Sequence, residues 1–438
     1  MNLSVIKLHE METKCHLFEI GKELNIPVWD LLRVEVCFRY IYKYDSGESD
    51  RSTLKVGNWL YTFWVWLKGF RLLLYRKRNL FISNPRDLNA RSESYDKILN
   101  DLIEHSRKNS YLLIRATPPI NKTNLKYYNY NGVLYFLRLF TSAPHFSENE
   151  FAPIKLALNE FYDISVCENE LNELFTYLYK QYKAYKLLFR ILHPHKIISS
   201  IPFKPIFYAA RELNITSYEM QHAGIVFDYP SYSYPSMVTP ESNIAFADYY
   251  VQFGEAWGEK NNIPAKRIVL GNNNFIPSSF VCHFDFPYIL IISDSIHIEI
   301  LIKYAKDLAQ RCANMMIIYK LHPSEFAKKE WYIEQFSTIK NIRVLTIEYP
   351  LYDLIKYMKI MVLVYSSSFF EAISLNKKVA IIQYDNYYLL KEFAEDCKNA
   401  YFVHNVDDII DIMNTDELNS KHLFYSPLNI NEVTKILK

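Results

Sequence analysis

Glycine is scarce in this sequence of 438 residues: there are nine glycines, and none follows Gly271. A Gly-rich dinucleotide fingerprint and a P-loop both need several glycines at fixed spacing, so the C-terminal part of the chain carries neither motif. Any phosphate bound there would have to be held by a helix N-terminus, by hydroxyl groups and by cations.

Paired cysteines are also missing. The six cysteines stand far apart, and no two have the C-x-x-C spacing. This pattern argues against a disulfide framework and a zinc site, and it indicates a reducing compartment. The stretch from Met1 to Gly21 mixes lysine and glutamate with apolar residues, so we expect no signal peptide there. We expect no metal and no other cofactor.

Acidic residues are absent from Arg51 to Arg86, a window that holds eight lysines and arginines. Its longest largely apolar run, Trp59 to Leu67, is well short of the roughly 20 residues that span a bilayer. Trp, Leu and Phe beside Lys and Arg are typical of a helix that lies in a membrane interface. A buried helix with basic side chains at its ends has the same composition. We therefore expect residues 51–78 to contact either a membrane surface or the core.

The overall balance of residue types is that of a soluble globular protein, with 50% hydrophobic and 22% charged residues. The length suggests two or three domains, each with its own core. Strand-like apolar runs alternate with helical segments, which predicts an α/β fold with mostly parallel, doubly wound sheets. We expect an N-terminal domain over 1–272, a linker over 273–287, a C-terminal domain over 288–415 and a closing segment over 416–438.

One predicted strand, Met316 to Leu321, stops at a turn that carries chemistry. Lys320 and His322 are two residues apart, so they point to the same side of an extended chain. Pro323 fixes the backbone, and Ser324 is placed to cap a following helix. Ligands of open α/β sheets bind at the carboxyl ends of such strands. A cation and an imidazole there favour a phosphate site, with a helix-capping histidine beside a solvated lysine as the alternative.

A second strand, predicted over 360–365, stops at a serine turn. Ser366, Ser367 and Ser368 offer hydroxyl groups and, where the next helix begins, backbone N–H groups that hold phosphate without a metal. An ordinary helix cap is the alternative. Glu371, about one turn into that helix, could accept hydrogen bonds from ribose hydroxyls or simply complement the helix dipole.

The first strand predicted in the C-terminal domain, 288–293, ends in two further polar residues, Ser293 and Asp294. Parallel strands of one sheet end at the same edge, where ligands of such sheets bind. We therefore include both residues among the candidates for donor binding.

The N-terminal domain offers a partner for this site. The strand predicted over 215–222 ends in Gln221 and His222, which would face a crevice. A histidine with a pKa near neutrality can take a proton from a hydroxyl group, although a histidine satisfied in a turn is the alternative. Asp228, Tyr232 and Tyr234 in the following loop could contact a sugar, together with Gln221.

These motifs resemble those of bacterial surface-polysaccharide glycosyltransferases of the GT-B type, over roughly residues 215–385. Similar His-Pro and Ser-Ser motifs occur in bacterial sialyltransferases, polysialyltransferases and Kdo transferases, which use CMP-sugars, and in CDP-glycerol glycerophosphotransferases. The resemblance implies two Rossmann-like domains that face a cleft, with the nucleotide phosphate held by the histidine and the serines and without a metal. The motifs are Gln221-His222-x-Gly224, Tyr249 to Trp257, Arg267 to Asn272, Lys320-x-His322-Pro323 and Ser366-Ser367-Ser368-x-x-Glu371-Ala372.

Three features depart from the family pattern. Ala223 separates His222 from Gly224, where the family usually has a His-Gly pair. The paired acidic residues before a glycine that form the base motif of sialyltransferases are not evident. The usual glycine after the donor-site helix is replaced within the stretch 375–378. The first two departures leave the identity of the catalytic base open, and the third concerns packing.

The expected activity is transfer of a sugar from a nucleotide donor, with a CMP-sugar favoured, to a surface polysaccharide or lipid-linked glycan, with inversion. His222 would deprotonate the acceptor, and Lys320, His322 and the serines would neutralise the departing phosphate. A CDP-polyol glycerophosphotransferase would use the same site. A sugar-nucleotide 2-epimerase would need extra carboxylates near the cleft, and a non-enzymatic polysaccharide-binding or assembly protein would not need Lys320 and His322.

The expected partners are a nucleotide-sugar, a glycan or glycolipid and a membrane surface, but not nucleic acid. We expect a cytoplasmic protein, peripheral on the inner face of the cytoplasmic membrane if residues 51–78 contact lipid.

Overall fold

The structure of the chain is a computed structural model in which two compact units can be distinguished. Unit 1 comprises Met1–Gln252, Gly258–Ile268 and Ile430–Lys438, and unit 2 comprises Phe253–Trp257 and Val269–Asn429. Each is described by itself. The described residues are 5–41, 67, 69–74, 79–83, 87–88, 94–96, 98–106, 111–115, 127–144, 150–222, 224, 229–273, 286–349, 351–384, 387–415 and 424–438.

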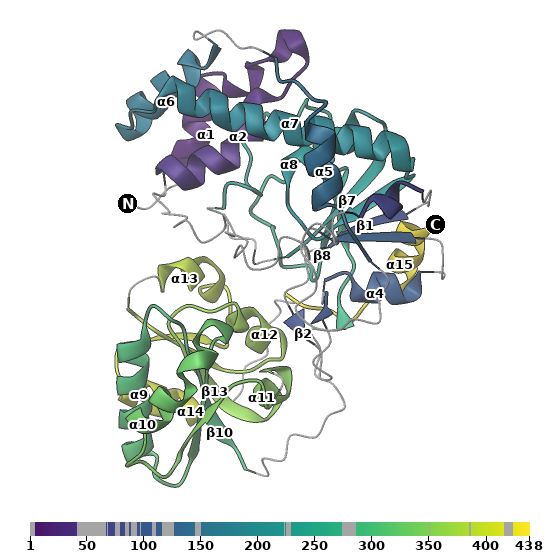
Figure 1. Cartoon of the computed structure of the whole chain (residues 1–438). Coiled ribbons are helices and arrows are strands. Elements are labelled where there is room, and N and C mark those ends of the chain that lie inside the picture. Colours follow the sequence, from purple (N-terminus) through teal and green to yellow (C-terminus); the bar gives the residue numbers. More distant parts are fainter. Residues whose placement is uncertain are drawn as a thin grey trace. The chain divides into compact units, whose positions relative to one another are not determined.

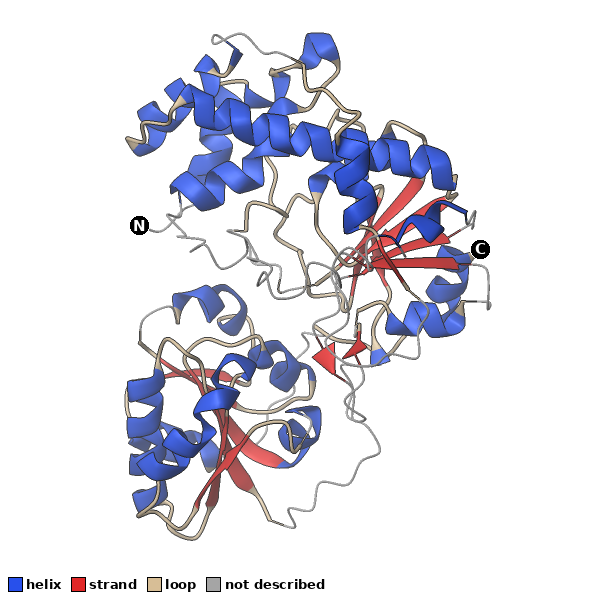
Figure 2. Cartoon of the chain, viewed as in Figure 1, coloured by secondary structure: helices blue, strands red, loops and turns tan. Residues whose placement is uncertain are grey.

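Unit 1 is built on a seven-stranded sheet with the strand order β5-β4-β1-β6-β7-β8-β9. Strands are drawn in red in Figure 2. Neighbouring strands from β5 to β8 are parallel. Such order, with the first strand inside the sheet and later strands added on both sides, is that of a doubly wound α/β domain. The strands are β1 (Asn79–Ser83), β4 (Tyr111–Arg115), β5 (Tyr128–Asn129), β6 (Lys196–Ser199), β7 (Thr216–Met220), β8 (Tyr249–Gln252) and β9 (Lys266–Val269). A separate antiparallel pair is formed by β2 (Asp87–Leu88) and β3 (Ser94–Tyr95).

The longest helix of unit 1, α7 (Glu168–Leu192), packs against α5 (Asn131–Arg138) and α8 (Lys204–Arg211) (Figure 1). Its buried leucine, phenylalanine and tyrosine residues recur at helical spacing, which places them along one stripe of the helix. The other helices of unit 1 are α1 (Val5–Lys14), α2 (Val28–Val36), α4 (Asn100–His105), α6 (Ala152–Tyr162) and α15 (Ile430–Leu437), with the short turns η1 (Leu17–Glu19), η2 (Lys22–Leu24), η3 (Cys37–Ile41) and η6 (Phe70–Leu74).

Unit 2 is built on a six-stranded sheet, and all its neighbouring strands are parallel, in the order β12-β11-β10-β13-β14-β15. Both faces of β10 are buried, as expected for a central strand covered by helices on either side. The strands are β10 (Tyr288–Ile292), β11 (Met316–Lys320), β12 (Ile342–Leu345), β13 (Met358–Leu363), β14 (Val379–Ile382) and β15 (Ala400–Val403).

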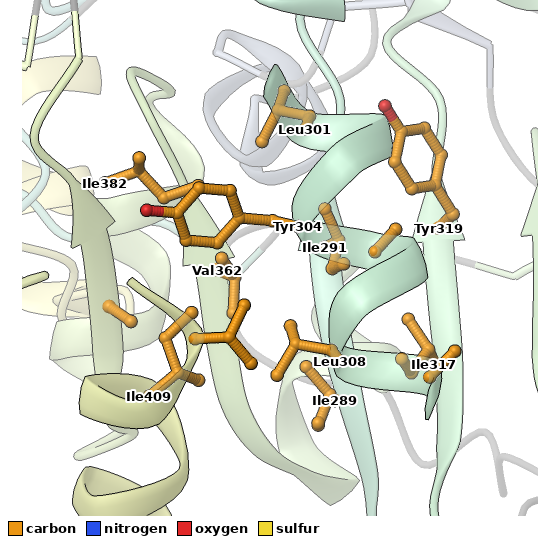
Figure 3. Close-up of a cluster of buried hydrophobic side chains, with 14 of the residues drawn as sticks. Ile289, Ile291, Leu301, Tyr304, Leu308, Ile317, Tyr319, Val362, Ile382 and Ile409 are labelled. Carbon is orange, nitrogen blue, oxygen red and sulfur yellow. The ribbon is translucent and has the colours of Figure 1, made fainter. Parts of the chain in front are cut away.

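The core of unit 2 lies between this sheet and its helices (Figure 3). Ile289, Ile291 and Val362 from the sheet pack with Leu301 and Leu308 of α9 (Ile298–Arg311). Burial of each such side chain contributes about 1.5–3 kcal/mol. The remaining helices of unit 2 are η9 (Pro323–Lys328), α10 (Lys329–Gln335), α11 (Leu351–Tyr357), α12 (Ser368–Ser374), α13 (Tyr388–Ala394) and α14 (Val406–Met413).

Two short segments pack with the unit from which they are separated in the chain. Phe253–Trp257 follows a unit 1 strand but belongs to unit 2, and Ile430–Lys438 follows unit 2 but belongs to unit 1. Trp257 packs with Phe370 and Phe424 of unit 2, and its indole N–H donates to the carbonyl oxygen of Phe424 at 2.5 Å. Helix α15 contacts α4 in unit 1, where Lys196 Nζ donates to the carbonyl oxygen of Ile436 at 2.8 Å. These units therefore differ from the predicted division at residues 253–257, 269–272 and 430–438.

The predicted pair of Rossmann-like α/β domains is confirmed by the two parallel sheets. Of the basic aromatic segment 51–78, only 67 and 69–74 are described, so its contact with membrane or core stays a prediction. None of the described helices has both the length and the apolar character needed to cross a membrane.

Candidate functional site

The polar turns predicted for unit 2 lie at one edge of its sheet. Ser293 follows β10, the turn at His322 follows β11, and Ser366 comes shortly after the end of β13. Strand β10 lies between β11 and β13, and all three are parallel, so Ser293 is placed between the other two turns. Its backbone N–H donates to the carbonyl oxygen of Lys320 at 2.9 Å. This edge is where ligands of open α/β sheets bind.

The imidazole of His322 is exposed and has a defined orientation. Its Nδ1 accepts from the backbone N–H of Ser324 at 3.2 Å and lies 2.7 Å from Ser324 Oγ. Because Nδ1 is an acceptor, the proton of the neutral ring is on Nε2. The histidine therefore presents an N–H donor to solvent, which suits a phosphate oxygen.

A buried carboxylate that the sequence analysis did not single out fixes this turn. Glu325 is 1% exposed, and its Oε2 accepts from Ser293 Oγ at 2.7 Å and from the backbone N–H of His322 at 3.3 Å. Its Oε1 accepts from the hydroxyl of Tyr332. Glu325 thus ties the turn after β11 to the end of β10. The capping residue of η9 is His322, and not Ser324 as predicted. The sequence signal for Glu325 was its position three residues after His322, which is that of a capping box.

The side chain of Lys320 has different partners from that of His322. Its Nζ donates to the carbonyl oxygens of Thr346 and Tyr349, the latter at 3.1 Å, in the segment that follows β12. Burial lowers the pKa of Lys320 to about 8, against the opposing effect of Glu348. The described contacts join the ammonium group to these carbonyls, and its role in donor binding stays a prediction.

The serine turn has the geometry expected of a helix start. Ser366 Oγ accepts from the backbone N–H of Ser368 at 3.3 Å and donates to Ser368 Oγ at 3.1 Å. Ser367 is exposed and Ser366 is half-buried, and their role in donor binding stays a prediction. Glu371 is buried in α12, and its Oε1 accepts from the hydroxyl of Tyr352 at 2.8 Å.

Asp294 serves the start of α9 and orients a histidine. Its Oδ1 accepts from the backbone N–H groups of Ile296 at 2.9 Å and His297 at 2.8 Å. Both carboxylate oxygens lie 2.9 Å from Nδ1 of His297, whose side chain is buried. The other ring nitrogen, Nε2, is buried without a hydrogen-bond partner in the part of the chain that the structure describes. His297 could not be recognised from the sequence. Its backbone N–H and its ring both contact Asp294 only because of the conformation of the loop between β10 and α9.

In unit 1 the structure brings His222 together with Tyr232. Nδ1 of His222 lies 3.3 Å from the hydroxyl of Tyr232, which donates to Glu219 Oε1 at 2.8 Å. When Glu219 is ionised, the only phenolic proton goes to Glu219, so the hydroxyl oxygen can accept from Nδ1–H. The lone pair of the imidazole is then on Nε2, the form that acts as a base.

Glu219, on β7, is the second carboxylate that the sequence analysis missed. It is 2% exposed, and burial raises its pKa to about 7, against the opposing effects of Lys204 and the Tyr232 hydrogen bond. The glutamate was not recognised because the strand reads as buried, and its partners come from the distant segments 204 and 232.

The other acceptor-side predictions have internal contacts. Tyr234 is buried, and its hydroxyl donates to Asp30 Oδ1 at 2.7 Å and accepts from Lys204 Nζ. Gln221 is also buried, and its backbone N–H donates to the carbonyl oxygen of Val251 at 2.8 Å. Asp228 lies outside the described residues. The roles of these residues in acceptor binding stay predictions.

Within the described ranges, no group of three or more His, Cys, Asp and Glu side chains is arranged to hold a metal ion. Two groups of side chains are candidates for the functional site. One is the set of turns at the carboxyl edge of the unit 2 sheet. The other is the hydrogen-bonded chain Glu219–Tyr232–His222 at the end of β7 in unit 1.

No known protein-family profile matches the chain, and no curated protein matches it. Solved structures do. UDP-GlcNAc 2-epimerase from Methanocaldococcus jannaschii is 14% identical, covering 82% of this chain and 99% of that chain, with a TM-score of 0.46. The S. aureus MnaA–UDP co-structure is 9% identical, with coverage of 82% and 97% and a TM-score of 0.46. The glycosyltransferase SnogD from Streptomyces nogalater is 10% identical, with coverage of 83% and 94% and a TM-score of 0.44. Likeness at this level does not indicate an activity.

Proposed function

We propose that the chain is a glycosyltransferase that moves a sugar from a nucleotide-sugar to a glycan acceptor, with inversion and without a metal. The observation that carries the proposal is the His322 turn, in which a buried glutamate and Ser324 hold an exposed imidazole with its Nε2–H directed outward. A CMP-sugar is the favoured donor, because the His-Pro and serine motifs resemble those of transferases that use CMP-sugars. The acceptor is a surface polysaccharide or a lipid-linked glycan.

The proposed reaction divides between the two groups of residues. The acceptor hydroxyl gives its proton to Nε2 of His222, and its oxygen forms a bond to the anomeric carbon of the donor sugar. The bond from that carbon to the phosphate oxygen breaks, and the electron pair leaves with the nucleotide. His322 Nε2–H and the serine turn donate hydrogen bonds to the departing phosphate, where stabilisation of developing charge has its largest effect. Asp294 and Ser293 shape the same edge of the sheet, and Glu371 fixes the ribose.

The test of the donor site is a thermal-shift screen of the full chain with CMP, CDP, UDP and GDP. A ligand at about 100 times its dissociation constant stabilises the folded state by about 2.7 kcal/mol, so at least one nucleotide should raise Tm by several degrees. The rise should be lost in Ser367→Ala. A flat response to all four nucleotides would exclude a nucleotide site, and the transferase with it.

The test of the base is turnover of His222→Ala with the nucleotide-sugar that the screen favours. We expect kcat to fall about 100-fold or more, with donor affinity unchanged, because a general base contributes about 100- to 10,000-fold. Unchanged turnover would place the base elsewhere. Product analysis separates the alternatives: a glycerophosphotransferase transfers a polyol phosphate, an epimerase converts the donor without an acceptor, and an assembly protein consumes no donor.

We also propose that residues 51–78 bring the protein to a membrane surface, since Trp and Arg are enriched there and acidic residues are absent. Flotation with liposomes that contain anionic lipids tests this. We expect the chain with Trp64→Ala, Trp66→Ala and Gln in place of Arg76, Lys77 and Arg78 to float less than the unmodified chain. Equal flotation of both would show that the segment does not bind lipid.

A further inference from the structure

The carboxyl edge of the unit 1 sheet holds a second arrangement, centred on Arg115. Arg115 is the last residue of β4 and is 0% exposed. Its Nε, Nη1 and Nη2 atoms are all buried without a hydrogen-bond partner among the residues that the structure describes. A guanidinium group carries five N–H donors and keeps its charge in proteins. Burial of such a group without any acceptor is strongly unfavourable, so its presence needs a reason.

A comparison within the same unit shows that this chain can satisfy a buried arginine fully. Arg33 also has no exposed surface, and its guanidinium donates to both carboxylate oxygens of Glu12 and to the carbonyl oxygens of Pro230 and Ser233. Arg115 has the same side chain, but none of the described residues accepts a hydrogen bond from its guanidinium. Its N–H donors are therefore available to a ligand.

Asp96, an acidic residue whose charge acts on Arg115, does not fill this role. It is close enough to oppose the lowering of the Arg115 pKa that burial causes, but no ion pair joins the two side chains. Instead, Asp96 Oδ1 accepts from the backbone N–H groups of Ile98 at 3.0 Å and Leu99 at 3.1 Å. Asp96 Oδ2 accepts from the hydroxyls of Ser83 and Ser200. Four donors thus occupy its oxygens.

The same contacts fix the surroundings of Arg115. Ser83 ends β1 and is the register partner of Arg115 on the neighbouring strand. Ser200 follows β6, on the other side of β1. Asp96 therefore clamps the ends of β1 and β6, and the ring of Tyr127 lies 5.1 Å from the guanidinium carbon. Fixed neighbours of this kind, Ser83 on the next strand and the ring of Tyr127, hold a binding group ready for a ligand.

We propose that Arg115 binds an oxyanion, a carboxylate or a phosphate, of the acceptor. The fork of N–H donors matches such groups in bidentate fashion, and a desolvated arginine is suited to them. That this oxyanion belongs to the acceptor rests on the proposed transferase function. Strands β4 and β7 are separated by β1 and β6 in the sheet. Arg115 ends β4 and His222 follows β7, and the two strands lie about 14 Å apart at about 4.8 Å per strand. The anionic group and the reacting hydroxyl of the acceptor then belong to different building blocks of the glycan.

The experiment is a thermal-shift titration of the full chain with sodium phosphate, sodium glucuronate and, as the uncharged control, glucose, at constant ionic strength. All samples contain the best nucleotide from the screen at saturation, so that the unit 2 site is occupied. We expect phosphate or glucuronate, but not glucose, to raise Tm. A response to phosphate alone indicates a lipid-linked phosphate, and a response to glucuronate alone indicates an acidic sugar.

Variants connect the response to the arginine. Arg115→Met should abolish the rise, and Arg115→Lys should weaken anion affinity by about tenfold, because lysine keeps the charge but loses the fork. Arg311→Gln, which removes an exposed arginine of α9 paired with Asp407, should respond like the unmodified chain. In anion-free buffer Arg115→Met should melt no lower than the unmodified chain, because it removes a buried charge that has no acceptor.

Two results overturn the proposal: no response of the unmodified chain to either anion, or an undiminished response of Arg115→Met. If Arg115→Met does not fold, the response of the unmodified chain and of Arg115→Lys still decides. The outcome is separate from that of the proposed function. If neither anion raises Tm but a nucleotide still raises the Tm of Arg115→Met, the anion proposal fails and the donor site stands. If an anion raises Tm but no nucleotide does, Arg115 is an anion site in a protein that is not a transferase.

Discussion

At the scale of single residues, the site depends on side chains that orient other side chains. Ser324 directs the imidazole of His322, and Tyr232 connects His222 to a buried carboxylate. The histidines were visible in the sequence because each follows a predicted strand. Their supporting partners were not, because the contact between Glu219 and Tyr232 joins residues that no local pattern relates. The tautomer of each ring, and so its chemistry, is set by these partners.

Replacement of His322 tests the donor site at this scale. A hydrogen bond between an N–H donor and a charged phosphate contributes about 1.5–3 kcal/mol, so His322→Ala should weaken nucleotide binding by about 10- to 100-fold. Isothermal titration calorimetry measures the change. His195→Ala removes an exposed imidazole in the loop before β6 and should leave the affinity unchanged. Equal affinities for His322→Ala and the unmodified chain would remove His322 from the donor site.

Glu219 should give the protein a stability that depends on pH. Its pKa is about 7 in the folded state against 4.5 for an ordinary glutamate, so between these pH values the folded state binds more protons than the unfolded state. The free energy of unfolding therefore falls as the pH rises from about 4.5 to about 7, by up to about 3 kcal/mol. The glutamine of Glu219→Gln does not titrate. The Tm of this variant should therefore rise relative to that of the unmodified chain as the pH is raised from 5 to 8.

The control for this pH series is Glu173→Gln, which changes an exposed glutamate of α7. Its Tm should follow that of the unmodified chain at every pH. A constant difference in Tm between Glu219→Gln and the unmodified chain from pH 5 to 8 would show that Glu219 does not take up a proton in this range.

At the scale of elements, the strand ends are the part of the fold that sequence predicts well. The apolar run before Lys320 is confirmed as β11, and the helix after the serine turn is confirmed as α12. The preceding strand β13 ends at Leu363, two residues earlier than the predicted end at Tyr365. Long apolar runs predict buried parallel strands because both faces of such strands are covered. They do not predict which turns are held against which neighbouring strand, because that depends on side-chain contacts. The hydrogen bond from Ser293 to Glu325, which joins the turn after β11 to the end of β10, is an example.

The turn after β11 should lose its structure when Glu325 is replaced. Glu325→Ala leaves the hydroxyls of Ser293 and Tyr332 and the N–H of His322 without their acceptor, and each buried unsatisfied group costs about 1–3 kcal/mol. We expect unit 2 to be destabilised by about 3 kcal/mol or more in chemical denaturation, with weaker nucleotide binding. Glu334→Ala, on the exposed side of α10, should change neither quantity. A stable Glu325→Ala chain with unchanged nucleotide affinity would contradict this account of the turn.

At the scale of the whole molecule, the units are not continuous in sequence. The chain passes between them at 252/253, 257/258, 268/269 and 429/430. The two parallel sheets were predictable from the alternation of strands and helices. The exchange of segments was not, because Trp257 and α15 each pack into a core made by residues that are distant in the sequence.

Removal of residues 430–438 should therefore destabilise unit 1 and spare unit 2. The deletion removes the carbonyl partners of Lys196 and Asn79 and the buried side chains of Val433 and Ile436. We expect limited proteolysis to cleave unit 1 faster, while the nucleotide-induced shift of unit 2 persists. Lys435→Gln changes only an exposed side chain of α15 and should behave like the unmodified chain. Equal rates of cleavage for the deletion and the unmodified chain would show that α15 does not stabilise unit 1.

The position of α15 also has a consequence for biosynthesis. The ribosome adds residues 430–438 after every residue of unit 2, although the helix they form completes unit 1. A nascent chain that has already emerged with all the sheet strands of unit 1 still exposes the surface that Val433 and Ile436 will cover. Unit 1 thus reaches its final packing only once unit 2 has been translated. During this interval the uncovered apolar surface is accessible to chaperones and to other nascent chains. The rate of translation through unit 2 therefore sets how long this surface stays exposed.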